Sequence, residues 1–153
     1  MALITWVYLL ILLIAIGGTL YLRLRVRLWA TVSWWRRGFY LLIAALTALV
    51  AWFYPATDVD GFVRNLFIFG MFLVFAFWPK GITPSAVIAG LGSSRPLGNL
   101  TGFTIEAVGP NQSRLLSQVG TIVVNRLKFS MPTTELMQEL TKFVPEDQIH
   151  RQA

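Results

Sequence analysis

Residues 2–22 read ALITWVYLLILLIAIGGTLYL, an apolar run without a single charged side chain. Two further apolar runs follow at 39–54 and 62–78. An α-helix rises 1.5 Å per residue, so roughly 20 residues cross the about 30 Å of a bilayer's hydrocarbon core. The whole chain is 56% hydrophobic and 13% charged, whereas a soluble domain carries about 25% charged residues. The three runs therefore predict a membrane protein with three transmembrane helices.

The polar residues are concentrated in one early loop and in the second half of the chain. This distribution predicts a transmembrane domain over 1–78 and a water-facing domain over 79–153. The second domain contains short β-like runs separated by glycine and proline, and then a segment whose apolar residues repeat at helical spacing. We expect a small α+β domain, with a short antiparallel sheet or open barrel and a C-terminal helix. The expected strands are 82–89, 100–108, 115–119 and 121–129, and the expected helix is 134–144.

Orientation follows from the arginines, because basic residues in short loops are retained in the cytoplasm. The loop after the first run carries five arginines, whereas the loop at 55–61 carries Asp58 and Asp60 and no basic residue. We therefore expect a multi-pass protein of the cell membrane, with its N-terminus outside and its C-terminus in the cytosol.

The early loop also contains a pattern of its own, because apolar residues and arginines alternate strictly over 22–28. Period two is typical of a strand with one apolar face. One interpretation is a basic strand that pairs with the cytosolic domain or lies along anionic headgroups; the other is the frayed, charged end of the first span. Basic residues near an acidic membrane surface contribute about 1 kcal/mol each. The candidate contacts to a partner or to lipid are Arg23, Arg25, Arg27, Trp29, Trp34, Trp35, Arg36 and Arg37.

Few residues within the spans suggest transport chemistry. Arg64 is the only charged residue in the third run; it is close enough to the end to reach the interface, with Asp60 one helical turn earlier as an expected ion-pair partner. In the second run Ala44 and Ala48, like Thr47 and Ala51, lie four residues apart. Small residues at this spacing allow helices to pack closely.

Catalytic and cofactor signatures are missing from the sequence. The stretch 90–98 is rich in glycine and serine, but it lacks the Gly-Lys-Ser/Thr ending of a phosphate-binding P-loop, so we interpret it as a flexible turn. His150, the only histidine, falls in what we interpret as a polar tail. The chain has no cysteine, and no serine is accompanied by a recognisable base. We therefore expect no catalytic residue, metal or cofactor. Nucleic acid is not an expected partner either, because 81–153 carries six basic and five acidic residues.

The order of elements resembles that of small bacterial multi-pass membrane proteins whose cytosolic C-terminal domain is similar to a pleckstrin-homology domain. The resemblance rests on Gly81-Ile82-Thr83 after the last span, on the runs 100–108 and 121–129, and on the helix 134–144. It departs at 89–98, where such domains usually place a second strand. The resemblance implies a binding or scaffolding module.

Together these patterns predict a non-enzymatic accessory or regulatory membrane protein. Its cytosolic domain and basic inner loop would bind a partner membrane protein or the anionic inner leaflet. The alternative is a small subunit of a transporter or channel complex, which would form a homo-oligomer or pack against a larger permease.

Overall fold

The computed structural model describes residues 2–152. These residues form two compact units. Unit 1 contains residues 2–24 and 32–78, and unit 2 contains 25–31 and 79–152. The expected boundary after residue 78 is thus also a boundary between units. The segment 25–31 differs from expectation, since the sequence placed it in a loop of the membrane domain.

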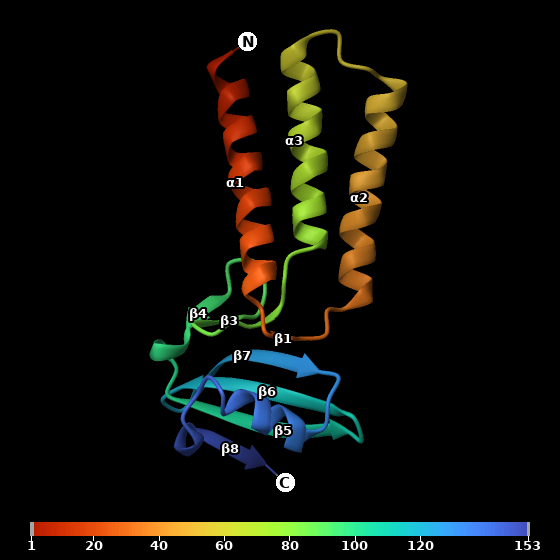
Figure 1. The fold of residues 1–153 in the computed structure, drawn as a ribbon. Coiled ribbons are helices and arrows are strands. Elements are labelled where there is room, and N and C mark those ends of the chain that lie inside the picture. The colour runs from red at the N-terminus through yellow and green to blue at the C-terminus, as the bar shows by residue number, and fades with distance from the viewer. Residues whose placement is uncertain (1, 153) are drawn as a thin grey trace. The chain divides into compact units, whose positions relative to one another are not determined.

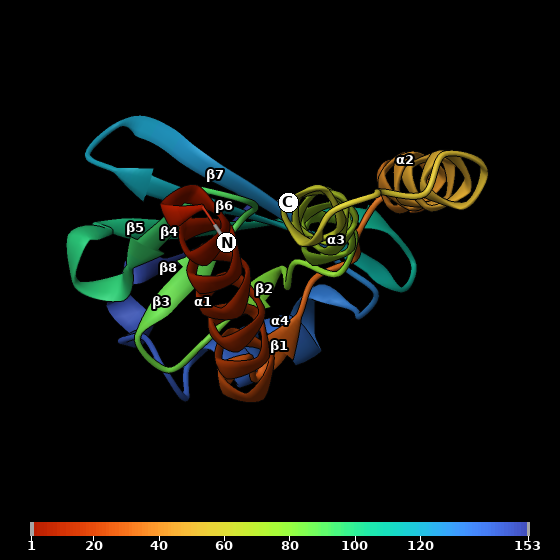
Figure 2. The same cartoon turned by 90° about the horizontal axis from the view of Figure 1, so that it is seen from above.

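Unit 1 is built from three helices: α1 (Leu3–Arg25), α2 (Trp34–Phe53) and α3 (Val59–Ala76). Each is long and apolar enough to span a membrane. Figures 1 and 2 show α3 between α1 and α2. Many large apolar side chains stay on the helix surfaces, among them Leu13, which is 72% exposed. Apolar surface on this scale is unfavourable in water and is suited to lipid.

Aromatic and small residues bring the helices together. The rings of Tyr8 in α1 and Phe67 in α3 stack with centroids 4.9 Å apart. A Cβ on Gly70 would lie 2.6 Å from a methyl group of Leu12, so this glycine allows α1 to approach α3. Ala44 of α2 is fully buried, whereas Ala48, its partner in the small-residue pattern of that run, is exposed.

The helices differ from the predicted spans at their ends. Helix α1 continues through Arg25 instead of ending at 22, and α2 begins at Trp34 instead of 39. The Asp60 carboxylate accepts a hydrogen bond from the Thr5 hydroxyl at 2.7 Å. The expected ion pair between Asp60 and Arg64 is not found among residues 2–152.

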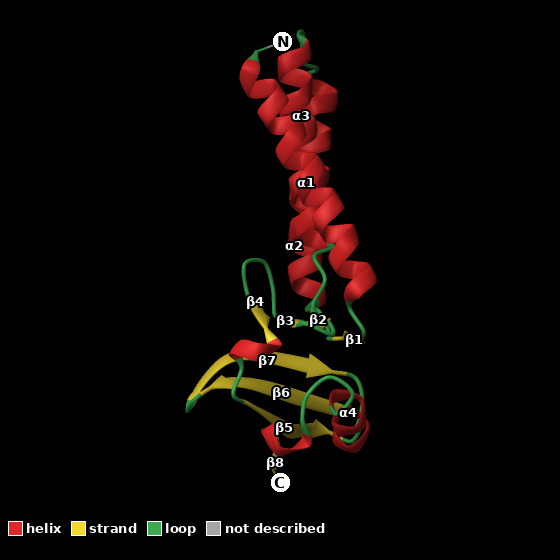
Figure 3. Cartoon of the chain, turned by 60° about the vertical axis from the view of Figure 1, so that its left-hand side comes forward, coloured by secondary structure: helices red, strands yellow, loops and turns green. Residues whose placement is uncertain are grey.

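Unit 2 contains two four-stranded sheets, with strand orders β1-β2-β3-β4 and β7-β6-β5-β8 (Figures 1 and 3). Neighbouring strands are antiparallel except for β5 and β8, which are parallel. The β6–β7 hairpin turns at Gly120, whose φ of +63° is readily adopted only by glycine. Helix α4 (Thr133–Leu140) follows β7. The strands are β1 (Leu28–Trp29), β2 (Gly81–Ile82), β3 (Ala86–Ile88), β4 (Ser94–Pro96), β5 (Gly102–Gly109), β6 (Gln112–Val119), β7 (Ile122–Phe129) and β8 (Ile149–Gln152).

The core of unit 2 joins both sheets and α4. Alternate residues of the long strands are fully buried, as period two requires. Leu136 and Leu140 of α4 are also fully buried against them, as the helical spacing predicted. The first sheet contributes Leu28, Ile82 and Val87 to the same cluster.

Several sequence-based expectations for this domain are wrong. The expected strand 82–89 is two strands, because Thr83 makes a turn in which its hydroxyl accepts the backbone N–H of Ala86 at 2.9 Å. The expected flexible turn 90–98 contains β4, which pairs with β3. The expected tail contains β8, which pairs with β5, so α4 is not the last element of the domain. The domain has two sheets instead of one, because β1 to β4 form a sheet of their own. Helix α4 ends at Leu140, before the predicted 144.

Candidate functional site

The basic segment 25–31 is a structural part of unit 2. Its side chains alternate strictly between the interior and the surface. Val26, Leu28 and Ala30 are buried, each no more than 6% exposed, whereas Arg25, Arg27 and Trp29 are exposed. Helix α1 continues through Arg25, and the alternation of buried and exposed side chains is used in the extended residues after it, of which Leu28–Trp29 form strand β1. The pairing of Leu28–Trp29 with β2 agrees with the interpretation as a strand that joins the small domain, whereas residues 22–25 continue the first helix.

Backbone hydrogen bonds fix the segment on two sides. The N–H of Arg27 donates to the carbonyl of Ile82 at 2.9 Å, and that of Ala30 to Lys80 at 3.0 Å. At its end, both the N–H and the hydroxyl of Thr31 donate to the carbonyl of Lys128, at 2.7 and 3.1 Å. The segment thus connects the edge of one sheet to β7, the edge strand of the other. Its exposed side chains are presented from a fixed backbone.

The other predicted contact residues lie in unit 1. Arg23 is exposed near the end of α1, and Trp34 and Trp35 are 84% and 86% exposed in the first turn of α2. Arg36 lies over the ring of Tyr40, with its guanidinium carbon 5.9 Å from the centroid, and is half-buried like Arg37.

A second basic cluster lies on the outward face of the sheet β7-β6-β5-β8 of unit 2. Arg114 and Lys128 are opposite one another on β6 and β7, and Arg126 lies two residues before Lys128 on the same strand face. The Arg114 guanidinium also contacts the carboxylate of Glu106 at 3.7 Å. The near balance of charge over residues 81–153 does not reveal this cluster. The sequence pattern that indicates the cluster is the alternation of polar and apolar residues in Asn125-Arg126-Leu127-Lys128-Phe129, which puts Arg126 and Lys128 on one face of a strand.

With segment 25–31 included, unit 2 carries nine basic and five acidic residues, a net charge of +4. This differs from the near balance that residues 81–153 show alone. The added charge comes from Lys80 and from two of the predicted contact residues, Arg25 and Arg27. Unit 2 therefore favours an acidic partner surface more strongly than its continuous part suggested.

The residues considered for chemistry lie apart. His150 is exposed on β8, opposite Thr104. Arg95, in the glycine-rich stretch, is exposed on β4, opposite Val87. Within residues 2–152, no three histidine or carboxylate side chains gather as a metal site would require. The segment 25–31 is thus the feature of unit 2 that the geometry singles out.

Comparison with known protein families, curated proteins and solved structures found no match for the chain. The resemblance of the small domain to pleckstrin-homology domains stays a prediction.

Proposed function

We propose that the protein is a non-enzymatic, membrane-anchored accessory protein that binds a partner membrane protein through segment 25–31. The observation that supports this proposal is the alternation in that segment, which buries its apolar residues in unit 2 and turns Arg25, Arg27 and Trp29 outward. A segment that served only as a charged topological anchor would gain nothing from being built into a folded domain.

The two chain segments that make up unit 2 support insertion of α2 and α3 into the membrane as a pair. Segment 25–31 precedes α2, and residue 79 follows α3. Because both segments belong to one folded unit, they lie on the same side of any membrane that α2 and α3 enter. Helices α2 and α3 then cross as a hairpin, and α1 crosses alone. The arginine bias supports an orientation with unit 2 in the cytosol and the N-terminus outside.

Arginine and tryptophan are the residues in which binding energy is most often concentrated at protein interfaces. Arg27 and Trp29 are two residues apart in an extended segment, so their side chains leave the same face. Their backbone is already fixed by the hydrogen bonds to Ile82 and Lys80, which reduces the entropy lost on binding. Anionic headgroups of the inner leaflet would assist by attracting the same arginines.

The test is crosslinking in native membranes followed by purification of the full-length protein. We expect the wild type to capture a membrane protein, and Arg27→Glu combined with Trp29→Ala to capture it about thirtyfold less, as for two residues that dominate an interface. Arg95→Glu is the matched control, because Arg95 is also exposed on the same sheet. Equal capture by the double variant and the wild type would contradict the proposal, because segment 25–31 would then be only a topological anchor. Capture of lipid without a protein would contradict it as well.

A second candidate function is that of a small subunit packed against a larger permease. It is favoured by α1, whose side chains Trp6, Leu10 and Leu13 are 61–72% exposed along its length. In that case α1 would carry the contact with the partner, and the change at Arg27 and Trp29 would leave capture intact.

A further inference from the structure

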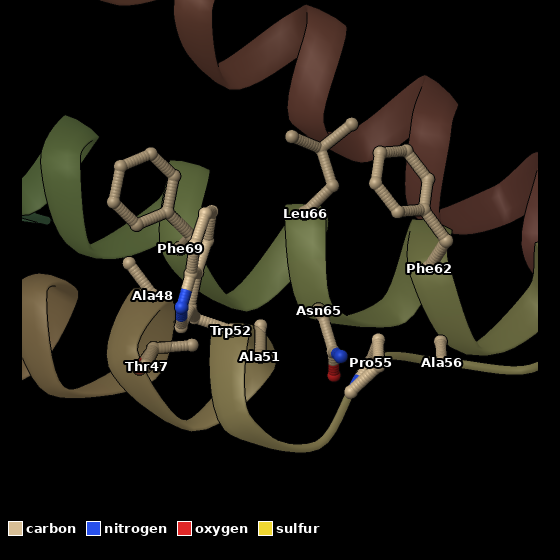
Figure 4. A pocket seen from close by; sticks show the side chains of 10 residues that line it. All are labelled: Thr47, Ala48, Ala51, Trp52, Pro55, Ala56, Phe62, Asn65, Leu66 and Phe69. Atoms are coloured by element: carbon tan, nitrogen blue, oxygen red, sulfur yellow. The ribbon is translucent and has the colours of Figure 1, made fainter.

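Two surface features of the molecule have no assigned partner. A groove of about 370 Å³ between α2 and α3 is lined by uncharged residues, so its chemistry selects no particular ligand (Figure 4). Strand β7 of unit 2 differs from this groove, because its backbone and its charges both restrict what can bind there. It is the edge strand of the sheet β7-β6-β5-β8 (Figure 3).

The backbone of β7 has an open side. The carbonyl of Lys128 faces away from β6, because it accepts hydrogen bonds from the N–H and the hydroxyl of Thr31, at 2.7 and 3.1 Å. In an antiparallel pair the N–H and the carbonyl of one residue face the same side, and every second residue faces that side. Arg126 therefore also turns its N–H and carbonyl away from β6, and neither is hydrogen-bonded to another segment among residues 2–152. These two groups are available to a further strand.

The side chains beside this open backbone are cationic. Arg126 and Lys128 are exposed, and no ion pair of either is found within residues 2–152. Arg114, directly opposite Lys128, is the member of the cluster that contacts a carboxylate, that of Glu106. Like charges on directly opposite residues destabilise a sheet. A carboxylate beside Arg126 would offset this repulsion, so the open side of β7 favours an acidic residue.

The other end of β7 is apolar. Ile122 is 68% exposed, and Val119, opposite it on β6, is 38% exposed. The edge is therefore apolar near the turn at Gly120 and cationic near Thr31. An extended chain that is acidic at one end and apolar at the other matches this edge in both its backbone and its side chains.

A second copy of this chain does not offer such a segment among residues 2–152. Glu106 is the only acidic residue in their strands, and its strand β5 is already paired on both sides, with β6 and β8. Two β7 edges laid against each other would bring arginine and lysine of one copy toward those of the other. The segment that fits β7 therefore comes from a different protein.

We propose that β7 accepts an extended segment of the partner protein as an added strand, with an acidic residue beside Arg126 and apolar residues beside Ile122. Main-chain hydrogen bonds supply affinity in this mode of recognition, and alternate side chains supply specificity. The inference rests on the proposed function, since Thr31, the residue bonded to β7, ends the partner-binding segment 25–31. It adds the conformation and the charge of the partner's segment.

The probe is a short synthetic peptide with capped ends, in which threonine and valine alternate around one central glutamate. Fluorescence anisotropy measures its binding to the full-length protein in mild detergent, beside the same peptide with a central lysine. We expect the wild type to prefer the glutamate peptide about tenfold, and Arg126→Glu to reverse the preference. Arg151→Glu is the matched control, because Arg151 is exposed on β8, the opposite edge strand of the same sheet. It should bind as the wild type does.

Two methylated forms of the glutamate peptide test the backbone. One carries an N-methyl group on the glutamate, and the other carries N-methyl groups on the two residues beside it. Alternate N–H groups of an added strand face β7. One form should therefore bind about tenfold more weakly, as expected for a lost hydrogen bond, while the other binds like the unmethylated peptide. Equal binding of both forms would show that only charge attracts the peptide, and would overturn the proposal.

The absence of binding by the glutamate peptide at millimolar concentration would also overturn it, and so would equal binding of the glutamate and lysine peptides by the wild type. Capture in native membranes separates this inference from the proposed function. If Arg27→Glu with Trp29→Ala loses the partner and Arg126→Glu keeps it, segment 25–31 binds the partner and the added strand is wrong. If only Arg126→Glu loses the partner, the added strand is supported and the role of segment 25–31 is wrong.

Discussion

At the scale of single residues, Gly81 determines whether segment 25–31 can join unit 2. Its φ is +154°, and a Cβ at this position would lie 2.1 Å from the carbonyl oxygen of Leu28 and 2.9 Å from a methyl group of Val26. Neither neighbour can move easily, because Leu28 is paired through its backbone with β2 and Val26 is buried. Only glycine allows the two strands to approach this closely.

We therefore predict that Gly81→Ala displaces β1 and destabilises unit 2 by about 3 kcal/mol, the upper part of the range for overpacked interiors. Thermal unfolding and limited proteolysis of the full-length protein in detergent measure the effect, with new cleavage expected near Arg25 and Arg27. Gly98→Ala is the control, since no atom lies within 4 Å of a Cβ there and its φ is not positive. Identical unfolding of the two variants would show that the close approach of β1 and β2 is dispensable.

At the scale of elements, the long apolar helices and the strands β5 to β7 were predictable, because each carries its periodicity within its own residues. The two-residue strand β1 was visible only as a pattern with two interpretations. Its stability comes from pairing with residues 81–82, more than 50 positions away, and no local pattern reports that contact.

Strand β8 was missed because Ile149 is its single apolar residue, so the segment looks like a polar tail. In the structure Ile149 is 6% exposed and lies opposite Phe103 in the parallel pair with β5. His150, its neighbour, is exposed. An alternation that consists of one buried residue is too short to recognise from sequence.

Substitutions at Ile149 and at its neighbour His150 distinguish a folded strand from a polar tail. We predict that Ile149→Ala lowers the stability of unit 2 by about 2 kcal/mol or more, as for other large apolar residues removed from a core. His150→Ala should leave it unchanged within about 0.5 kcal/mol, because exposed side chains contribute little. Chemical unfolding of the full-length protein in detergent gives both values. If both variants unfold as the wild type does, the C-terminal residues do not form part of the folded unit.

At the scale of the whole molecule, unit 2 is discontinuous along the chain. Segment 25–31 is separated from residue 79 by α2 and α3, which therefore form an insertion between two parts of one folded unit. The two points at which the insertion leaves and rejoins unit 2 lie close together, because the N–H of Ala30 donates to the carbonyl of Lys80 at 3.0 Å. This organisation couples the fold of the small domain to the presence of the first loop, and it places the basic residues Arg25 and Arg27 within that domain.

The discontinuity leads to a prediction about a protein without its helices. Strands β1 and β2 are antiparallel, so a hairpin can replace the insertion. Residues 25–31 joined by Asn-Gly to residues 79–153 leave four residues between Ala30 and Lys80, a common hairpin loop length. We expect this fusion to unfold cooperatively and to resist protease. Residues 79–153 alone should be protease-sensitive, because Leu28 and Ala30 are then missing from the core.

Leu28→Asp in the fusion is the control, since it keeps the chain length and removes the buried contact, and it should behave as the shorter fragment does. Equal stability of the fragment and the fusion would mean that segment 25–31 is only appended to a domain that folds without it, and the proposed partner surface would then lose its fixed backbone.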